Sequence, residues 1–123
     1  MSYVERHAVT VTTDGSGDAT AYSPTVTGRL FQIRYVKTDF ANGVDFTITS
    51  EATGETLWSQ LNVNASATVA PRQATHDTSG VAALYAAAGS AVNDYIGLSK
   101  DRVKIVVAQG GATKTGTFHI VMG

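Results

Sequence analysis

The chain has 123 residues, a length that suits one ordinary domain and leaves no room for a second. Hydrophobic residues make up 43% of the chain and charged residues 15%, which is enough apolar side chain for a core and too little charge for a disordered chain. The formal net charge of -1 argues against nucleic acid, a membrane surface or a polyanionic substrate as the partner.

The sequence contains no cysteine, which excludes disulfides, thiolate metal sites and a cysteine nucleophile and fits synthesis in a reducing cytoplasm. The N-terminal part holds no apolar run of signal-peptide length. The longest apolar stretches, residues 81–88 and 103–108, are far shorter than the roughly 20 residues that cross a bilayer. We therefore expect a chain without a signal peptide and without a membrane span.

The N-terminal part of the chain predicts three strands. Apolar and polar residues alternate within residues 4–13, and a Gly-rich segment at 14–18 ends this first strand. A short return strand is expected over residues 19–23. The third strand shows the clearest alternation, because three apolar residues share one of its faces: Phe31, Ile33 and Tyr35.

The middle of the chain predicts a meander. The Asn-Gly pair at 42–43 favours left-handed conformations, so we expect a hairpin that leads into a strand over residues 44–49. Residues 56–58 and 63–69 predict two further strands, and Pro71 ends the second of them because it cannot donate to a ladder.

The C-terminal part predicts a last pair of strands, over residues 103–107 and 115–122, joined by a Gly-rich turn. In total we expect about eight short antiparallel strands, a number typical of a two-sheet sandwich or a jelly-roll-like barrel. The predicted fold is therefore all-β, and residues 1–123 form a single domain.

Residues 72–101 do not show the alternation, and we expect a long irregular loop there, before the last two strands. Leu84, Tyr85 and the neighbouring alanines could instead form two helical turns over residues 81–89. A third interpretation has the segment fold over one open end of the sandwich and bury Leu84 and Tyr85. Connections longer than about 15 residues are uncommon in compact domains and tend to be functional.

No catalytic, cofactor-binding or metal site is expected. The histidines lack ligand spacing, and His76, Asp77 and Ser79 are neighbours in one loop, an arrangement that seldom gives triad geometry. The Gly-rich segment 14–18 resembles a calcium loop without the distal acidic ligand, so a turn is the simpler interpretation. Aromatic side chains offer a sugar-binding platform as an alternative, with these candidates: Tyr22, Tyr35, Trp58, Tyr85 and Tyr95.

Three strand-and-turn patterns resemble small virion proteins of tailed bacteriophages. They are the run at 10–20, the strand at 45–49, and the segment from 101–105 to 116–118. Such proteins are commonly head decoration or cement subunits, or parts of the neck and tail. The resemblance implies a non-enzymatic structural subunit that is made in the host cytoplasm, joins the virion, and binds the major capsid protein or other virion proteins, as a homo-oligomer. A neck, connector or tail-associated protein and a carbohydrate-binding adhesin module remain alternatives.

Turns and tails are where such a subunit would contact its neighbours. We expect an N-terminal arm over residues 1–7 and a second contact through the long loop. The interface candidates are Tyr3, Arg6, Arg72, His76, Leu84, Tyr85 and Tyr95.

Overall fold

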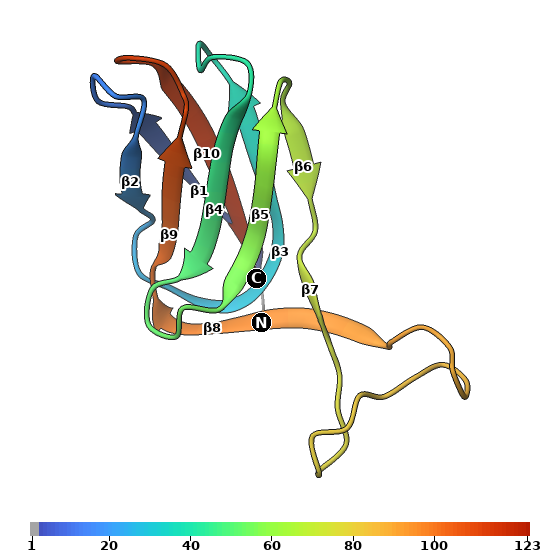
Figure 1. The fold of residues 1–123 in the computed structure, drawn as a ribbon. Helices are drawn as coiled ribbons and strands as arrows, with labels where there is room; N and C mark the ends of the chain where they lie inside the picture. The colour runs from blue at the N-terminus through green and yellow to red at the C-terminus, as the bar shows by residue number, and fades with distance from the viewer. Residues whose placement is uncertain (1–2) are drawn as a thin grey trace.

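A computed structural model describes residues 3–123 as two antiparallel β-sheets packed face to face (Figure 1). Sheet A has the strand order β1-β10-β3-β8-β7, with β6 also paired to β3, and sheet B has the order β2-β9-β4-β5. The strands are β1 Glu5–Thr12, β2 Ala19–Tyr22, β3 Val26–Lys37, β4 Val44–Ser50, β5 Thr56–Val63, β6 Ala67–Val69, β7 Arg72–Ala74, β8 Asn93–Asp101, β9 Val103–Ala108 and β10 Thr115–Met122.

The prediction of an all-β antiparallel sandwich is confirmed, and neither sheet closes into a barrel. The described residues form 10 strands rather than about eight. The two additional strands, β7 and β8, lie in the segment expected to be irregular. Residues 63–69 are not one strand, because Val63 ends β5 and the chain pairs again only at β6. Within residues 3–123, no helix is present that could span a membrane.

Aromatic side chains fill the centre of the sandwich. Tyr35 from sheet A lies 5.1 Å from both Phe46 and Phe118, measured between ring centroids. Trp58 packs edge-on against Phe46 at 4.8 Å. Aromatic pairs at such separations add to the stabilisation that burial alone gives. The core is therefore built from both sheets, with β3 and β10 of sheet A and β4 and β5 of sheet B contributing these aromatic side chains.

The connection at 42–43 is a turn between sheets and not the predicted hairpin. Gly43 does adopt a positive φ of 87°. However, β3 belongs to sheet A and β4 to sheet B, so the two strands do not pair. The last two strands cross between the sheets in the same way, whereas β4 and β5 do form a hairpin. The prediction was wrong because the residues of a turn do not determine which sheet the next strand joins.

Phe31 lies outside the core, although alternation placed it on the same face as Ile33 and Tyr35. Both of those residues are fully buried. The ladder between β10 and β3 is irregular here: Met122 pairs with Leu30, while Val121 pairs with Gln32. The skipped residue is Phe31. A β-bulge of this kind re-aims the extra side chain, and here it turns Phe31 onto the outer face of sheet A.

β8 and β9 are joined by a sharp bend that carries the chain from sheet A to sheet B. Asp101 sits in this bend and is 6% exposed. Its carboxylate accepts hydrogen bonds from the Ser50 hydroxyl, from the Ala52 amide at 3.0 Å and from the Arg102 amide at 2.7 Å. These bonds connect the bend to the turn between β4 and β5, and the bond from the Ser50 hydroxyl is the main reason that the pKa of Asp101 is lowered.

The prediction of a long irregular loop over residues 72–101 is confirmed for residues 75–92, which belong to no named strand, and is wrong for residues 72–74 and 93–101, which form β7 and β8. β7 pairs with β8 in the register Arg72 to Tyr95. Beyond this ribbon, residues 75–92, which we call the arm, extend away from the sandwich (Figure 1). The arm forms no helix and does not cover an end of the sandwich: Leu84 is 45% exposed and Tyr85 is 75% exposed.

Most of the expected N-terminal arm is also strand. Residues 1 and 2 lie outside the described residues, and Tyr3 and Val4 precede β1 and are exposed. Residues 5–7 pair with β10 in a regular ladder. The prediction of a free arm is therefore wrong for residues 5–7, because their backbone groups are bonded within sheet A.

Candidate interaction surface

The arm is held in shape by its own backbone. Three hydrogen bonds join Thr75, Ala83 and Val92: the Thr75 amide donates to the Val92 carbonyl (2.8 Å), the Ala83 amide to the Thr75 carbonyl (2.9 Å), and the Val92 amide to the Ala83 carbonyl (3.0 Å). Near the tip, the Asp77 carboxylate accepts bonds from the amides of Ser79 (2.8 Å) and Val81 (3.0 Å). The arm is therefore an ordered segment with defined turns.

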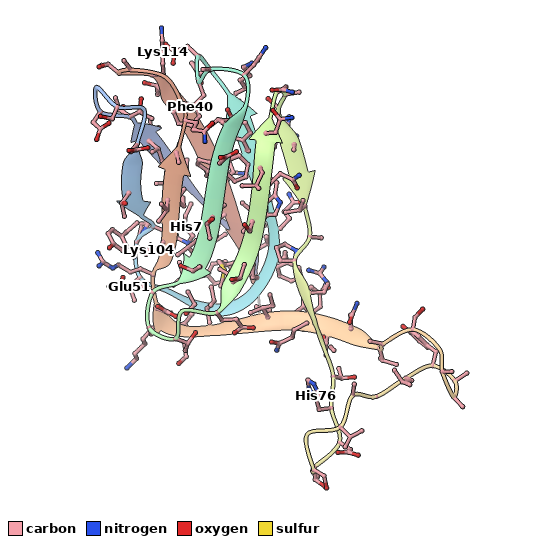
Figure 2. All side chains as sticks on the ribbon, in the orientation of Figure 1. His7, Phe40, Glu51, His76, Lys104 and Lys114 are labelled. Carbon is pink, nitrogen blue, oxygen red and sulfur yellow. The ribbon has the colours of Figure 1, made fainter. Side chains whose placement is uncertain are left out.

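The side chains of the arm are small or apolar, and most of them are exposed. Val81 is 61% exposed, and together with Leu84 and Tyr85 it forms what we call the apolar tip. The only ionisable groups besides Tyr85 are His76 and Asp77 (His76 is labelled in Figure 2). Exposed apolar residues grouped on a projecting ribbon are typical of a protein contact surface.

A second cluster lies where the arm leaves the sandwich. The ring of Tyr95 receives two guanidinium groups, that of Arg72 at 4.2 Å and that of Arg29 at 5.3 Å from its centroid. Phe31 packs edge-on against Tyr95 at 4.9 Å, and Arg29 also lies over Phe31 at 5.7 Å. Each such cation–π contact stabilises by about 0.5–1 kcal/mol at exposed sites. We call these four residues the arginine–aromatic cluster.

The two arginines of this cluster lack a counter-charge in the described part of the chain. Arg72 donates hydrogen bonds from Nη1 to the carbonyl oxygens of Pro71 (2.8 Å) and Phe31 (3.1 Å). The ion pairs formed within residues 3–123 are His7 with Glu5 and Arg102 with Glu51. Neither involves Arg29 or Arg72, so both guanidinium groups lie against the Tyr95 ring without a carboxylate partner among the described residues.

The sequence-predicted interface residues fall into two groups. Tyr3, Arg72 and Tyr95 come together at the base of the arm, where Tyr3 lines a small hollow with Arg29 and Phe31. Arg6 lies farther along the same sheet. The other predicted residues belong to the arm: His76, Leu84 and Tyr85. The predicted residues are therefore divided between the base of the arm and the arm itself, rather than between an N-terminal arm and a loop.

Sequence reasoning missed two members of the cluster, Arg29 and Phe31. Phe31 was assigned to the core because regular inward-outward alternation was assumed along the whole strand, whereas the β-bulge interrupts it at Phe31. Arg29 attracted no attention because Gly28 and the polar residues before it favoured a connection, whereas β3 already begins at Val26. The Gly-Arg-Leu-Phe order gives no local sign that the register changes, so only the β10 pairing reveals the cluster.

The residue groups that resembled chemical sites have other roles. The Asp77 carboxylate bonds to the amides of its own turn and not to His76. Asp14 does the same with the amides of Ser16 (2.8 Å) and Asp18 (3.1 Å), and these backbone bonds lower its pKa. Among residues 3–123, no group of three His, Asp or Glu side chains is placed to hold a metal ion.

The aromatic platform considered for sugar binding is not assembled. Tyr35 is fully buried and Trp58 is 8% exposed, because both belong to the core. Tyr22 is on the outer face of sheet B, where the Arg102 guanidinium covers it at 4.1 Å and is itself paired with Glu51. Tyr85 is exposed on the arm, and the ring of Tyr95 on sheet A is covered by the guanidinium groups of Arg29 and Arg72. These rings do not form one stacking surface.

Comparison with known proteins adds no family. No protein-family model matches the chain, and no curated protein matches it. The crystal structure of FLHE is similar over 98% of this chain and 98% of that chain, with 9% sequence identity and a TM-score of 0.44. A likeness at that distance carries no argument about function.

Proposed function

We propose that the chain is a non-enzymatic structural subunit of a bacteriophage particle, a capsid decoration or cement protein that binds and stabilises the major capsid shell. The observation that carries this proposal is the arm. A small sandwich that holds an ordered ribbon with an apolar tip away from its body has the form of a subunit that grips a neighbour. The resemblance of the strand-and-turn patterns to virion proteins is the reason for placing this subunit in a phage particle.

The apolar tip supports the proposal on energetic grounds. Leu84 and Tyr85 lose little conformational freedom when they bind, because the backbone on which they sit is already hydrogen-bonded. Aromatic and large aliphatic side chains are the usual anchors of protein interfaces. The alanines around them allow a partner to approach the backbone closely.

Copy number separates the proposed function from its nearest alternative. A decoration protein would be present in hundreds of copies per particle, whereas a neck or connector protein forms a ring of about a dozen. Quantitative mass spectrometry of purified particles of the phage that encodes the chain measures this ratio. Absence of the chain from the particles would overturn the proposal, and about a dozen copies would move the protein to the neck or tail.

The contribution of the arm can be tested on the same particles. Leu84→Ser combined with Tyr85→Ser should lower the occupancy of the chain on particles at least about tenfold, because anchor residues contribute about 2 kcal/mol or more each. Lys114→Gln serves as the control, since Lys114 is at the end of the sandwich opposite to the arm (Figure 2). Equal occupancy of the double variant and the control would exclude the arm as the contact.

The adhesin alternative has no comparable support, because its aromatic residues are divided among the core, the outer faces of both sheets and the arm. A glycan array with the Tyr85→Ala variant as a reference remains the direct test of that alternative. Binding of a sugar that this variant loses would favour it over a capsid role.

A further inference from the structure

The outer face of sheet A carries Arg6 and Arg34. Arg6 pairs with Val121, and Arg34 pairs with His119. Directly paired residues of an antiparallel sheet point to the same face, and so do residues two apart along one strand. Because Val121 and His119 are two apart on β10, both arginines share a face. The intervening Ile120 is fully buried, so this face is the one turned away from the core.

Arg29 and Arg72 lie on the same outer face. Arg29 pairs with Gly97 and Arg72 pairs with Tyr95, and these two partners are again two apart, on β8. Between them Ile96 points into the core at 3% exposure. The outer face of sheet A therefore holds four of the five arginines of the chain, and we call it the arginine face.

Charges of the two signs are separated on this molecule. The other side chains on the arginine face are Thr, Val, Ala, Gln, Asn, His, Tyr and Phe, with no Asp or Glu among them. All ten acidic residues lie elsewhere in the chain. A chain with a net charge of -1 thus presents one distinctly positive surface, and that surface adjoins the base of the arm.

The carboxylates of this protein are mostly occupied by its own turns. Six of the seven aspartates accept hydrogen bonds from backbone amides of this chain: Asp14, Asp39, Asp45, Asp77, Asp94 and Asp101. Glu51 is paired with Arg102. A second copy could therefore offer the arginine face mostly carboxylates that already accept hydrogen bonds within their own turns, which leaves fewer acceptor sites for a guanidinium. The counter-charge is therefore better supplied by a different protein.

We infer that the arginine face binds a carboxylate-rich surface of another protein, with Arg29 and Arg72 as its anchors. The planar fork of N–H donors on a guanidinium matches a carboxylate in a bidentate manner. Both groups are already held over the ring of Tyr95, so little side-chain entropy remains to be lost on binding. The inference rests on the proposed function only for the identity of that protein as a virion component.

Protein is favoured over nucleic acid by two observations. The nine acidic residues that are not buried lie elsewhere on the surface and would repel a polyanion that extends beyond the arginine face. In addition, the Tyr95 ring, which a base would need for stacking, is covered by guanidinium groups. A short row of carboxylates on a protein would not extend to the acidic residues elsewhere on the chain, and it would not need the Tyr95 ring for stacking.

A direct test is an NMR titration of the ¹⁵N-labelled full chain with hexaglutamate peptide, following the Nε–Hε signals of the arginines. Saturable shifts are expected at Arg29 and Arg72 and not at Arg102, which is already paired. Hexaglutamine should cause no shift at the same concentration. Because the attraction is electrostatic, raising the salt from about 0.02 to 0.3 M should abolish the binding.

Charge variants test the two anchors. Arg29→Gln and Arg72→Gln should each weaken hexaglutamate binding about three- to tenfold, whereas Lys114→Gln, which removes the same charge at the far end of the sandwich, should leave it nearly unchanged. Arg72→Lys should restore only part of the affinity, because it keeps the charge and loses the fork. Should a variant not fold, the shifts in the unmodified protein decide by themselves.

Three outcomes would overturn the inference. The first is an absence of shifts at Arg29 and Arg72, and the second is an equal loss of affinity in the Lys114→Gln control. The third is tighter binding of a thymidine oligonucleotide than of hexaglutamate to the same residues, which would assign the face to nucleic acid. None of these results concerns particle occupancy, so a failure here leaves the proposed function standing and the reverse also holds.

Discussion

At the scale of single residues, the buried carboxylate of Asp101 is the most informative group. It accepts one hydroxyl and two amide hydrogen bonds at the bend between the sheets. Asp101→Asn replaces one acceptor oxygen by a donor that faces the Ser50 hydroxyl and removes the negative charge. We expect a loss of about 2–3 kcal/mol in the free energy of unfolding, as is typical for hydrogen bonds to a charged group.

Chemical denaturation of the purified variant measures this change. Asp18→Asn is a matched control, because it makes the same change at an exposed position. In that turn the carboxylate that accepts the backbone hydrogen bonds is that of Asp14, not that of Asp18. A change below about 0.5 kcal/mol in the Asp101 variant, no larger than that of an ordinary surface substitution, would show that the bend does not depend on this carboxylate.

At the scale of elements, the arm and the sandwich should be energetically separate. Replacing residues 76–91 by an Asn-Gly turn joins Thr75 to Val92, whose backbones are already hydrogen-bonded. The removed side chains are nearly all exposed, so little buried area is lost. Calorimetry should place the Tm of the shortened protein within a few degrees of the original value, because a shift of about 4–8 °C corresponds to 1 kcal/mol in a domain of about this size.

A variant of the core gives a reference value for the change in Tm. Ile33→Ala empties a fully buried position and should cost about 2–5 kcal/mol. A fall in Tm for the shortened protein as large as that of Ile33→Ala would mean that the arm is part of the folding unit and would remove the basis for describing it as a contact device.

At the scale of the whole molecule, stability should depend on pH at both extremes. Burial raises the pKa of Tyr35 to about 12, while the unfolded chain ionises near 10. The folded state therefore holds this proton more tightly, and its advantage, fully present below pH 10, is lost as the pH rises from 10 to about 12. Linkage gives a loss of about 2–3 kcal/mol over that range.

The acid side has the opposite sign. The folded pKa of Asp101 lies below the ordinary value of 3.8, so its contribution is present above pH 3.8 and is lost as the pH falls through the lower folded value. Urea denaturation from pH 2 to 12 measures both limbs. Tyr35→Phe should abolish much of the alkaline loss and cost little stability at pH 7, because the Tyr35 hydroxyl is buried without a partner. An unchanged alkaline limb in this variant would contradict the assignment.

The sequence predicted the strands better than their arrangement. Period-two alternation located β1, β4, β9 and β10 to within one or two residues, because each has one face in the core. Pairing across sheets, by contrast, is a long-range property, and the turn at 42–43 carries no information about it. The ribbon of β7 and β8 was missed because β7 has three residues and none of them is buried, while the apolar residues that β8 buries are only two, Ile96 and Leu98.

The candidate surface was predictable only in part. Tyr85 and Leu84 were predicted as interface residues because large apolar side chains are unusual in a loop that does not belong to the core. Arg72 and Tyr95 were proposed as separate contacts, while their stacking depends on a register that no local pattern encodes. The bulge at Phe31 is the clearest example, since one skipped residue changes which side chains face outward.

The arm leaves the body and returns to it at hydrogen-bonded neighbours, Thr75 and Val92. A foreign epitope should therefore be tolerated as an insertion in the turn at residues 77–81 of the arm. Inserted residues there would not change the distance between the two ends of the arm. Antibody capture of the native, unheated fusion protein would detect such an epitope. If the arm contacts the shell as proposed above, antibody should capture the fusion protein when it is free and much less of it when it is bound to particles.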